Sequence, residues 1–122
     1  MVIDDDYVSN FIADHILCKL NICDNVSFSR NGDEAIKFLK QTDSFPELIF
    51  LDINMPVMDG FEFIETFKSF NLEKQKTRII IYTSSLTAQD IAMLKEAGFA
   101  DFILKPLTED KLLSLLKLFK DK

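Results

Sequence analysis

Acidic residues follow two short apolar runs of this 122-residue sequence. Asp4, Asp5 and Asp6 come directly after three apolar residues, and Asp52 ends the apolar run 48–51. A short apolar run bounded by turn residues predicts a strand that is buried on both faces. Because a buried carboxylate is costly unless it is paired or bound to a metal ion, these strand ends are the first candidates for a functional site.

Two further strand ends carry complementary groups. One apolar run leads into the hydroxyls of Thr83, Ser84 and Ser85, and a later one ends in Lys105. Carboxylates in one site repel each other, and Mg²⁺ or a lysine ammonium offsets that repulsion. Mg²⁺, lysine and a hydroxyl are also the groups that phosphoryl transfer requires. Asp52, alone at its strand end, is then the candidate nucleophile, because an aspartate can form an acyl phosphate.

Strands and helices alternate along the chain and explain how these residues meet. Apolar runs predict strands at 1–3, 26–30, 47–51, 78–85 and 100–106. Helical spacing and capping residues predict helices at 7–20, from Asn31 or Asp33 to 41, after Gly60, from Thr87 to Gly98, and at 109–121. This order predicts an α/β fold with a parallel sheet, helices on both faces, and all carboxyl ends of the strands at one edge. Ligands bind at that edge.

Helical spacing also predicts which side chains face the sheet. In the first helix, which Asp6 is expected to cap, the spaced apolar residues are Val8, Phe11, Ile12, Ile16 and Leu20. In the third helix, the residues expected to be buried are Phe63, Ile64, Phe67 and Phe70.

Size and composition place the chain among ordinary globular proteins. Residues 1–122 suit one domain, and the net charge of −6 argues against nucleic acid as a direct partner. No apolar run is long enough for a membrane span, so we expect a cytoplasmic protein with no membrane partner. Cys18 and Cys23 match no zinc or redox spacing and are expected to be small buried residues, and His15 a surface residue.

Four motifs in order resemble the receiver domain of two-component response regulators. They are "VIDDD", "FLDINMPVMDG", "IIIYTSS" and "FILKP". The resemblance, which extends over the whole chain, implies a chemotaxis-type receiver that stands alone, with a (βα)5 flavodoxin-like fold and the strand order 2-1-3-4-5. It implies a switch that accepts a phosphoryl group from a histidine kinase or a histidine phosphotransfer protein, and that catalyses only its own phosphorylation and dephosphorylation.

The resemblance assigns the metal ligands residue by residue. Asp52 is the phosphoacceptor and a ligand of Mg²⁺, for which Mn²⁺ can substitute. Asp5 and the main-chain carbonyl of Asn54 bind the ion directly, and Asp4 binds it through water.

The resemblance also assigns the phosphoryl-binding and switch residues. Thr83 and Lys105 bind the phosphoryl oxygens, and Thr83 and Phe102 form the switch. Many relatives have tyrosine at the position of Phe102, so a switch through a buried phenol is excluded here. Asn54 and Ser85, each two residues beyond a site residue, are expected to tune the lifetime of the acyl phosphate.

The last helix suggests an output surface. Its apolar residues cover more of the circumference than packing on a sheet requires, which leaves Leu113 and Leu118 at the margins. We expect the fourth helix, the fifth strand and this helix to bind a downstream protein or a second copy of the chain.

Three other functions fit these residues less well. A haloacid-dehalogenase-like phosphohydrolase also uses a strand-end aspartate, but it needs a second aspartate where this chain has Asn54. A flavodoxin-like electron carrier would bind FMN phosphate after the first strand, where the three aspartates would repel it. A receiver used only for docking is disfavoured by the complete set of Asp4, Asp5, Asp52, Thr83 and Lys105.

Overall fold

The computed structural model describes residues 1–20, 26–43, 46–55, 58–69, 77–99 and 101–120, and the side chains of 118–120 are not described. The strands are β1 (Val2–Ile3), β2 (Phe28–Ser29), β3 (Leu48–Leu51), β4 (Arg78–Thr83) and β5 (Phe102–Leu104). The helices are α1 (Tyr7–Lys19), α2 (Gly32–Gln41), α3 (Gly60–Lys68), α4 (Ala88–Glu96) and α5 (Glu109–Lys120). The alternation of strands and helices predicted from the sequence is confirmed.

The sheet is parallel and its strand order is β2-β1-β3-β4-β5, as the resemblance implied. Its register decides which residues meet at the carboxyl edge. Ile3 pairs with Leu51, so the next residues of β1 and β3, Asp4 and Asp52, leave the sheet side by side. Thr83 pairs with Leu104, so the chain places Lys105 directly beyond the end of β4.

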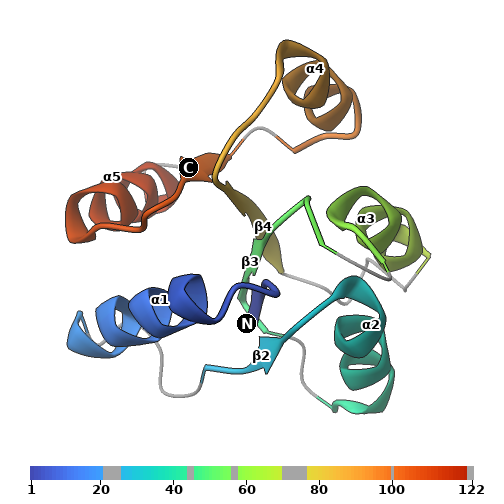
Figure 1. Ribbon diagram of the computed structural model, residues 1–122, viewed down its shortest axis with the longest axis horizontal. Coiled ribbons are helices and arrows are strands. Elements are labelled where there is room, and N and C mark those ends of the chain that lie inside the picture. Colours follow the sequence, from blue (N-terminus) through green and yellow to red (C-terminus); the bar gives the residue numbers. More distant parts are fainter. Residues whose placement is uncertain (21–25, 44–45, 56–57, 70–76, 100, 121–122) are drawn as a thin grey trace.

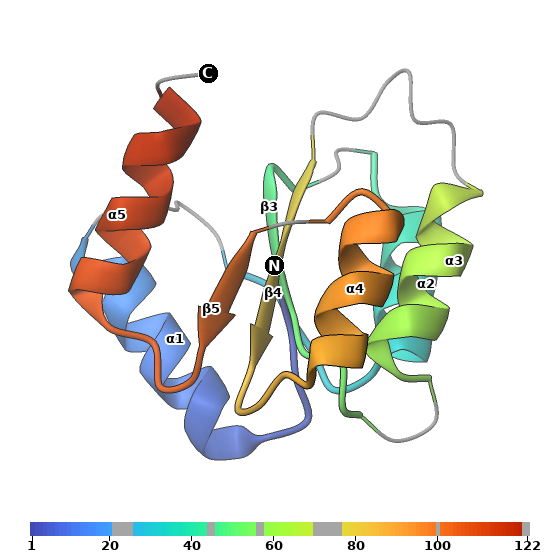
Figure 2. The same ribbon diagram turned by 90° about the horizontal axis from the view of Figure 1, so that it is seen from above.

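Helices cover both faces of the sheet, as Figures 1 and 2 show: α1 and α5 lie on one side, and α2, α3 and α4 on the other. The two cores share no buried side chain, because successive strand residues point to opposite faces. On β4, for example, Ile80 and Tyr82 belong to the α1–α5 core, whereas Ile79 and Ile81 belong to the other.

Short polar side chains begin all five of the described helices, and at α5 the Thr108 hydroxyl accepts a hydrogen bond from the Lys111 N–H at 3.2 Å. The side chains of Asp6, Asn31, Asp59 and Thr87 each accept a hydrogen bond from a backbone N–H in the first turn. At α4, Asp90 completes a capping box with Thr87. Such caps contribute about 1 kcal/mol each. The caps expected at Asp6 and Thr87 are confirmed, and Asn31, not Asp33, caps α2.

The predicted inner face of α1 is wrong in part. Val8 and Phe11 are 61% and 68% exposed, and the buried residues of this helix are Ser9, Ala13, Ile16 and Leu17. Apolar side chains surround much of α1, so two overlapping stripes compete for the core. The small side chains of Ser9 and Ala13 let the helix backbone approach the sheet closely. This stripe is therefore the one that faces the core.

The other sequence expectations for buried side chains have mixed outcomes. Cys18 is exposed and not buried, so that expectation was wrong. Phe63 and Phe67 are buried and stack at 5.7 Å between centroids, as expected of α3. The predictions for Cys23, Phe70 and the side chain of Leu118 fall on residues outside the described part.

None of the helices in the described ranges is long and apolar enough to cross a bilayer.

Candidate functional site

An ion-paired cluster lies at the carboxyl edge of the sheet. Lys105 Nζ lies 2.6 Å from Asp4 Oδ2 and 3.1 Å from Asp52 Oδ2, so one ammonium joins the ends of three strands. Asp4 and Asp52 are buried and the Lys105 side chain is 11% exposed. The ammonium therefore offsets part of the repulsion between two buried carboxylates.

Burial and the contacts within this cluster shift the pKa values of Asp4 and Lys105. It raises the pKa of Asp4 from 3.8 to about 6, although hydrogen bonds with Lys105 and the Asp6 N–H favour the ionised form. For Lys105, burial alone would lower the pKa, but the contacts with Asp4 and Asp52 outweigh it, and the pKa is raised. One ammonium does not fully compensate both carboxylates, so the cluster favours a further cation or proton.

The carboxylates meet the requirements of a hard metal ion. One oxygen each from Asp4, Asp5 and Asp52 lies within 4.8 Å of the others, and Asp5 is exposed while the other two are buried. Carboxylate oxygens in this number, open to solvent on one side, suit Mg²⁺, which binds through a few carboxylates and keeps several waters. The raised pKa of Asp4 points the same way, because a cation would relieve the cost of its buried charge.

Backbone and side-chain hydrogen bonds orient Asp52 and connect it to Thr83. The Asn54 N–H donates to Asp52 Oδ1 at 3.0 Å, while Lys105 holds Oδ2. Asn54 Nδ2 donates to Thr83 Oγ1 at 3.4 Å. The Lys105 N–H donates to the Thr83 carbonyl at 2.8 Å. Asp52, Thr83 and Lys105 are thus connected through contacts between β3, β4 and β5.

The remaining predicted residues lie at the margin of the cluster. Asn54 and Ser85 are exposed, so both side chains have access to solvent beside the site. Phe102 on β5 is partly buried and packs against the core under α4. The expected switch pair of Thr83 and Phe102 therefore comes from neighbouring strands, with Ile81 paired to Phe102.

Close packing holds the start of α3 against the residues that directly follow β3. A Cβ atom on Gly60 would lie 2.5 Å from Ile53 Cα and 2.8 Å from the Asp52 carbonyl oxygen. The Gly60 N–H donates to the Ile53 carbonyl at 3.2 Å. A side chain at this position would force the backbone after Asp52 to move, so the glycine lets α3 begin directly against the site.

Two residues near the cluster were missed in the sequence. Asn10 Nδ2 donates to the Asp4 carbonyl at 3.0 Å, which connects α1 to the end of β1. Lys105 Nζ lies 5.3 Å from the centroid of the Tyr82 ring, on the α1–α5 side of the sheet. The signal for Tyr82 was a single phenol among the isoleucines of β4, immediately before Thr83.

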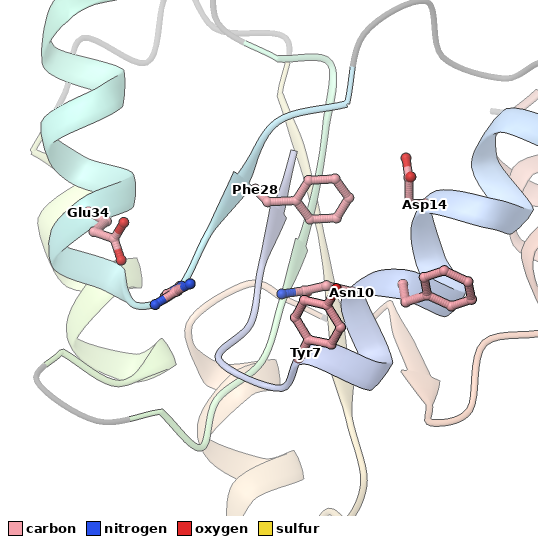
Figure 3. A pocket seen from close by; sticks show the side chains of 7 residues that line it. Tyr7, Asn10, Asp14, Phe28 and Glu34 are labelled. Carbon is pink, nitrogen blue, oxygen red and sulfur yellow. The ribbon is translucent and has the colours of Figure 1, made fainter.

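An open hollow of about 350 Å³ lies beside this cluster, between α1, β2 and the start of α2. Figure 3 shows Tyr7, Asn10 and Phe28 gathered around it, with Asp14 and Glu34 farther out. Phe11 and Arg30 complete its lining. Asp4, Asp52 and Lys105 do not line this hollow, so it is a separate surface feature and not the place where the carboxylates act.

The raised pKa of Asp4 predicts a pH-dependent metal affinity. Below about pH 6 Asp4 binds a proton, which competes with Mg²⁺, so the affinity should fall as pH is lowered through that value and level off above it. Calorimetric titration with Mg²⁺ across this range measures the change. Asp4→Asn should bind Mg²⁺ more weakly than the wild type, and its Mg²⁺ affinity should not change near pH 6. An equal Mg²⁺ affinity on both sides of pH 6 in the wild type would contradict the prediction.

Comparison with known proteins identifies the family. The family model described as "Response regulator receiver domain" matches residues 1–117. The chain belongs to this family. This receiver domain is 32% identical over 116 residues to the two-component response regulator 24 of Arabidopsis thaliana, covering 95% of this chain and 79% of that protein. It is 36% identical over 119 residues to hybrid signal transduction histidine kinase M of Dictyostelium discoideum. That match covers 96% of this chain but only 5% of the kinase.

Solved structures show the same fold. A two-component response regulator from Cytophaga hutchinsonii aligns with a TM-score of 0.86 at 29% identity, covering 99% of this receiver domain and 95% of that chain. The chemotaxis response regulator CheY4 of Vibrio cholerae aligns with a TM-score of 0.77 at 26% identity, covering 96% and 93% of the two chains. The doubly wound fold that the sequence predicted is therefore confirmed.

Proposed function

We propose that this receiver domain is a phosphoaccepting switch in which Asp52 takes a phosphoryl group from a histidine kinase or a histidine phosphotransfer protein. The observation that carries the proposal is the contact of Lys105 Nζ with both Asp4 and Asp52 beside a third carboxylate, Asp5. These are the groups that phosphoryl transfer to an aspartate requires.

Different residues of the chain have different roles in phosphoryl transfer. An oxygen of Asp52 attacks phosphorus, the bond from phosphorus to the donor's imidazole nitrogen breaks, and an acyl phosphate forms. Lys105 and the hydroxyl of Thr83 then bind the phosphoryl oxygens. Mg²⁺, when bound, neutralises charge on the phosphoryl group. Asp5, Asp52 and the Asn54 carbonyl would hold the ion directly, Asp4 would hold it through water, and Mn²⁺ would serve in its place.

Labelling with a small phosphodonor tests this function. Incubation with acetyl phosphate should give an adduct that is stable in acid and labile in alkali, because an acyl phosphate has those properties. The adduct should form with Mg²⁺ or Mn²⁺ and not in excess EDTA. Labelling that persists in EDTA would show that the carboxylates do not act through a divalent ion, and the proposal would fail.

The phosphohydrolase alternative gains no support from the site. Asn54, two residues beyond Asp52, carries an amide that cannot serve as the general acid of that reaction. A receiver used only for docking predicts no labelling in the same experiment, so that result would favour it.

The open surroundings of the site predict a short-lived adduct. The exposed Asn54 and Ser85 are small and polar, so neither shields the acyl phosphate from water, and self-dephosphorylation should be complete within minutes. Ser85→Phe should slow the decay by narrowing the access of water. Gln41→Phe, at an exposed residue in the last turn of α2, is the control and should leave the decay unchanged. A wild-type adduct that survives overnight at neutral pH would contradict the prediction.

We also propose that phosphorylation changes the surface formed by α4, β5 and α5. Among the side chains that the structure describes, each of these elements has one exposed large apolar residue, namely Met93, Leu104 and Leu113. Thr83 moves toward the phosphoryl oxygens, the ring of Phe102 follows, and a minor conformation gains population. The surface then binds a downstream protein or a second copy of the chain.

A charge on α5 tests the proposed output surface. Leu113 is 48% exposed, so Leu113→Glu should leave the fold intact but weaken association through this surface by at least about 1 kcal/mol. Sedimentation of the protein with and without beryllofluoride, a mimic of the acyl phosphate, measures association between copies. Phe38→Glu, at a residue on α2 that is also exposed, is the matched control. If beryllofluoride-induced association is as strong in Leu113→Glu as in the wild type, the contact surface lies elsewhere.

A further inference from the structure

The ring of Tyr82 contacts Lys105 from the face of the sheet that α1 and α5 cover. It is fully buried among the residues that α1 and α5 cover, and it directly precedes Thr83 on β4. The 5.3 Å between Lys105 Nζ and its ring centroid is within the range of a cation–π interaction. The phenol adds little polar contact, because Tyr82 Oη has no hydrogen-bond partner among the described residues. Burial raises the pKa of Tyr82, although the positive charge of Lys105 opposes this shift.

Lys105 thus has three partners of two kinds. Asp4 and Asp52 hold its ammonium by charge, and Tyr82 by the face of its ring. The two carboxylates are also donors for a divalent ion, and Asp52 is the proposed phosphoacceptor. A carboxylate engaged by the ion or by a phosphoryl group is less available to Lys105. An aromatic ring does not compete for Mg²⁺, which binds oxygen ligands.

We propose that Tyr82 is a positioning residue for Lys105. Its ring keeps the ammonium at the end of β5 when Asp4 and Asp52 are engaged, so that Lys105 is in place for the phosphoryl oxygens. The proposal rests on the function proposed above. The face of the Tyr82 ring positions the ammonium of Lys105, and the Tyr82 hydroxyl does not contribute.

Affinity for beryllofluoride at saturating Mg²⁺, followed by fluorine NMR, tests this role. Tyr82→Phe keeps the ring face and should bind the mimic like the wild type. Tyr82→Leu removes the ring and should weaken binding by roughly 3- to 30-fold. Its affinity for Mg²⁺ alone, measured by calorimetry, should not change, because Tyr82 donates nothing to the ion. Tyr82→Met fills more of the space and replaces the leucine variant should that protein not fold.

A matched control separates the ring's contact with Lys105 from its packing. Phe50 belongs to the same core, is equally buried, and meets Tyr82 edge-on at 6.2 Å between centroids. Phe50→Leu makes a similar cavity and should bind the mimic like the wild type. The inference is overturned if Tyr82→Leu binds like the wild type, if it loses no more than Phe50→Leu, or if Tyr82→Phe loses as much. If the wild type itself does not bind beryllofluoride with Mg²⁺, the proposed function fails with it.

Discussion

Asp52→Asn should abolish acyl-phosphate formation completely. Asparagine has nearly the shape of aspartate and can still accept the hydrogen bond from the Asn54 N–H, so the loop should keep its course. It lacks the carboxylate oxygen that attacks phosphorus, so the loss is one of chemistry and not of folding. Labelling with acetyl phosphate and Mg²⁺, read by intact mass, measures it. Asp52→Ala should give the same result.

The control for this prediction is another aspartate. Asp110 is exposed in the first turn of α5, and Asp110→Asn should be labelled like the wild type. Undiminished labelling of Asp52→Asn would place the phosphoacceptor at a different residue and would overturn the assignment of this site.

Lys105→Met should destabilise the metal-free protein strongly at neutral pH. The substitution leaves Asp4 and Asp52 buried without their shared cation, and removal of one partner of a buried ion pair costs about 3 kcal/mol or more. Burial raises the pKa of Asp4 to about 6 even though Lys105 lowers it, so removal of Lys105 should raise that pKa further. The loss should therefore grow as pH rises through about 6 and should shrink at lower pH, where Asp4 binds a proton.

Urea unfolding on both sides of pH 6, with and without Mg²⁺, measures this effect. A divalent ion would replace the lost positive charge, so Mg²⁺ should stabilise Lys105→Met more than it stabilises the wild type. Lys19→Met is the control, since the ion pair of Lys19 with Glu109 is exposed and should contribute less than about 1 kcal/mol. Equal urea midpoints for Lys105→Met and the wild type at neutral pH would show that the ammonium does not offset the carboxylates.

The gathering of the site residues followed from the sequence. Short apolar runs, each ending in a polar residue, predicted buried parallel strands, and in such a sheet the carboxyl ends lie at one edge. Asp4, Asp52 and Lys105 were therefore expected at one edge, and the strand order β1-β3-β4-β5 then brings them close enough to form the ion pairs. Local chemistry also sufficed for the helix starts at Asp6 and Thr87, because a capping side chain bonds only to its own first turn.

Only tertiary packing decided which of several similar side chains are buried against a neighbouring element. The sequence of α1 offered two apolar stripes, and contact with the sheet selected the one with Ser9 and Ala13, leaving Phe11 exposed. In the same way, the raised pKa of Asp4 comes from the burial around it, and the ring of Tyr82 reaches Lys105 from an adjacent strand. The period of a strand or helix determines which residues share a face. Only the neighbouring elements determine which face is covered and which side chains meet across it.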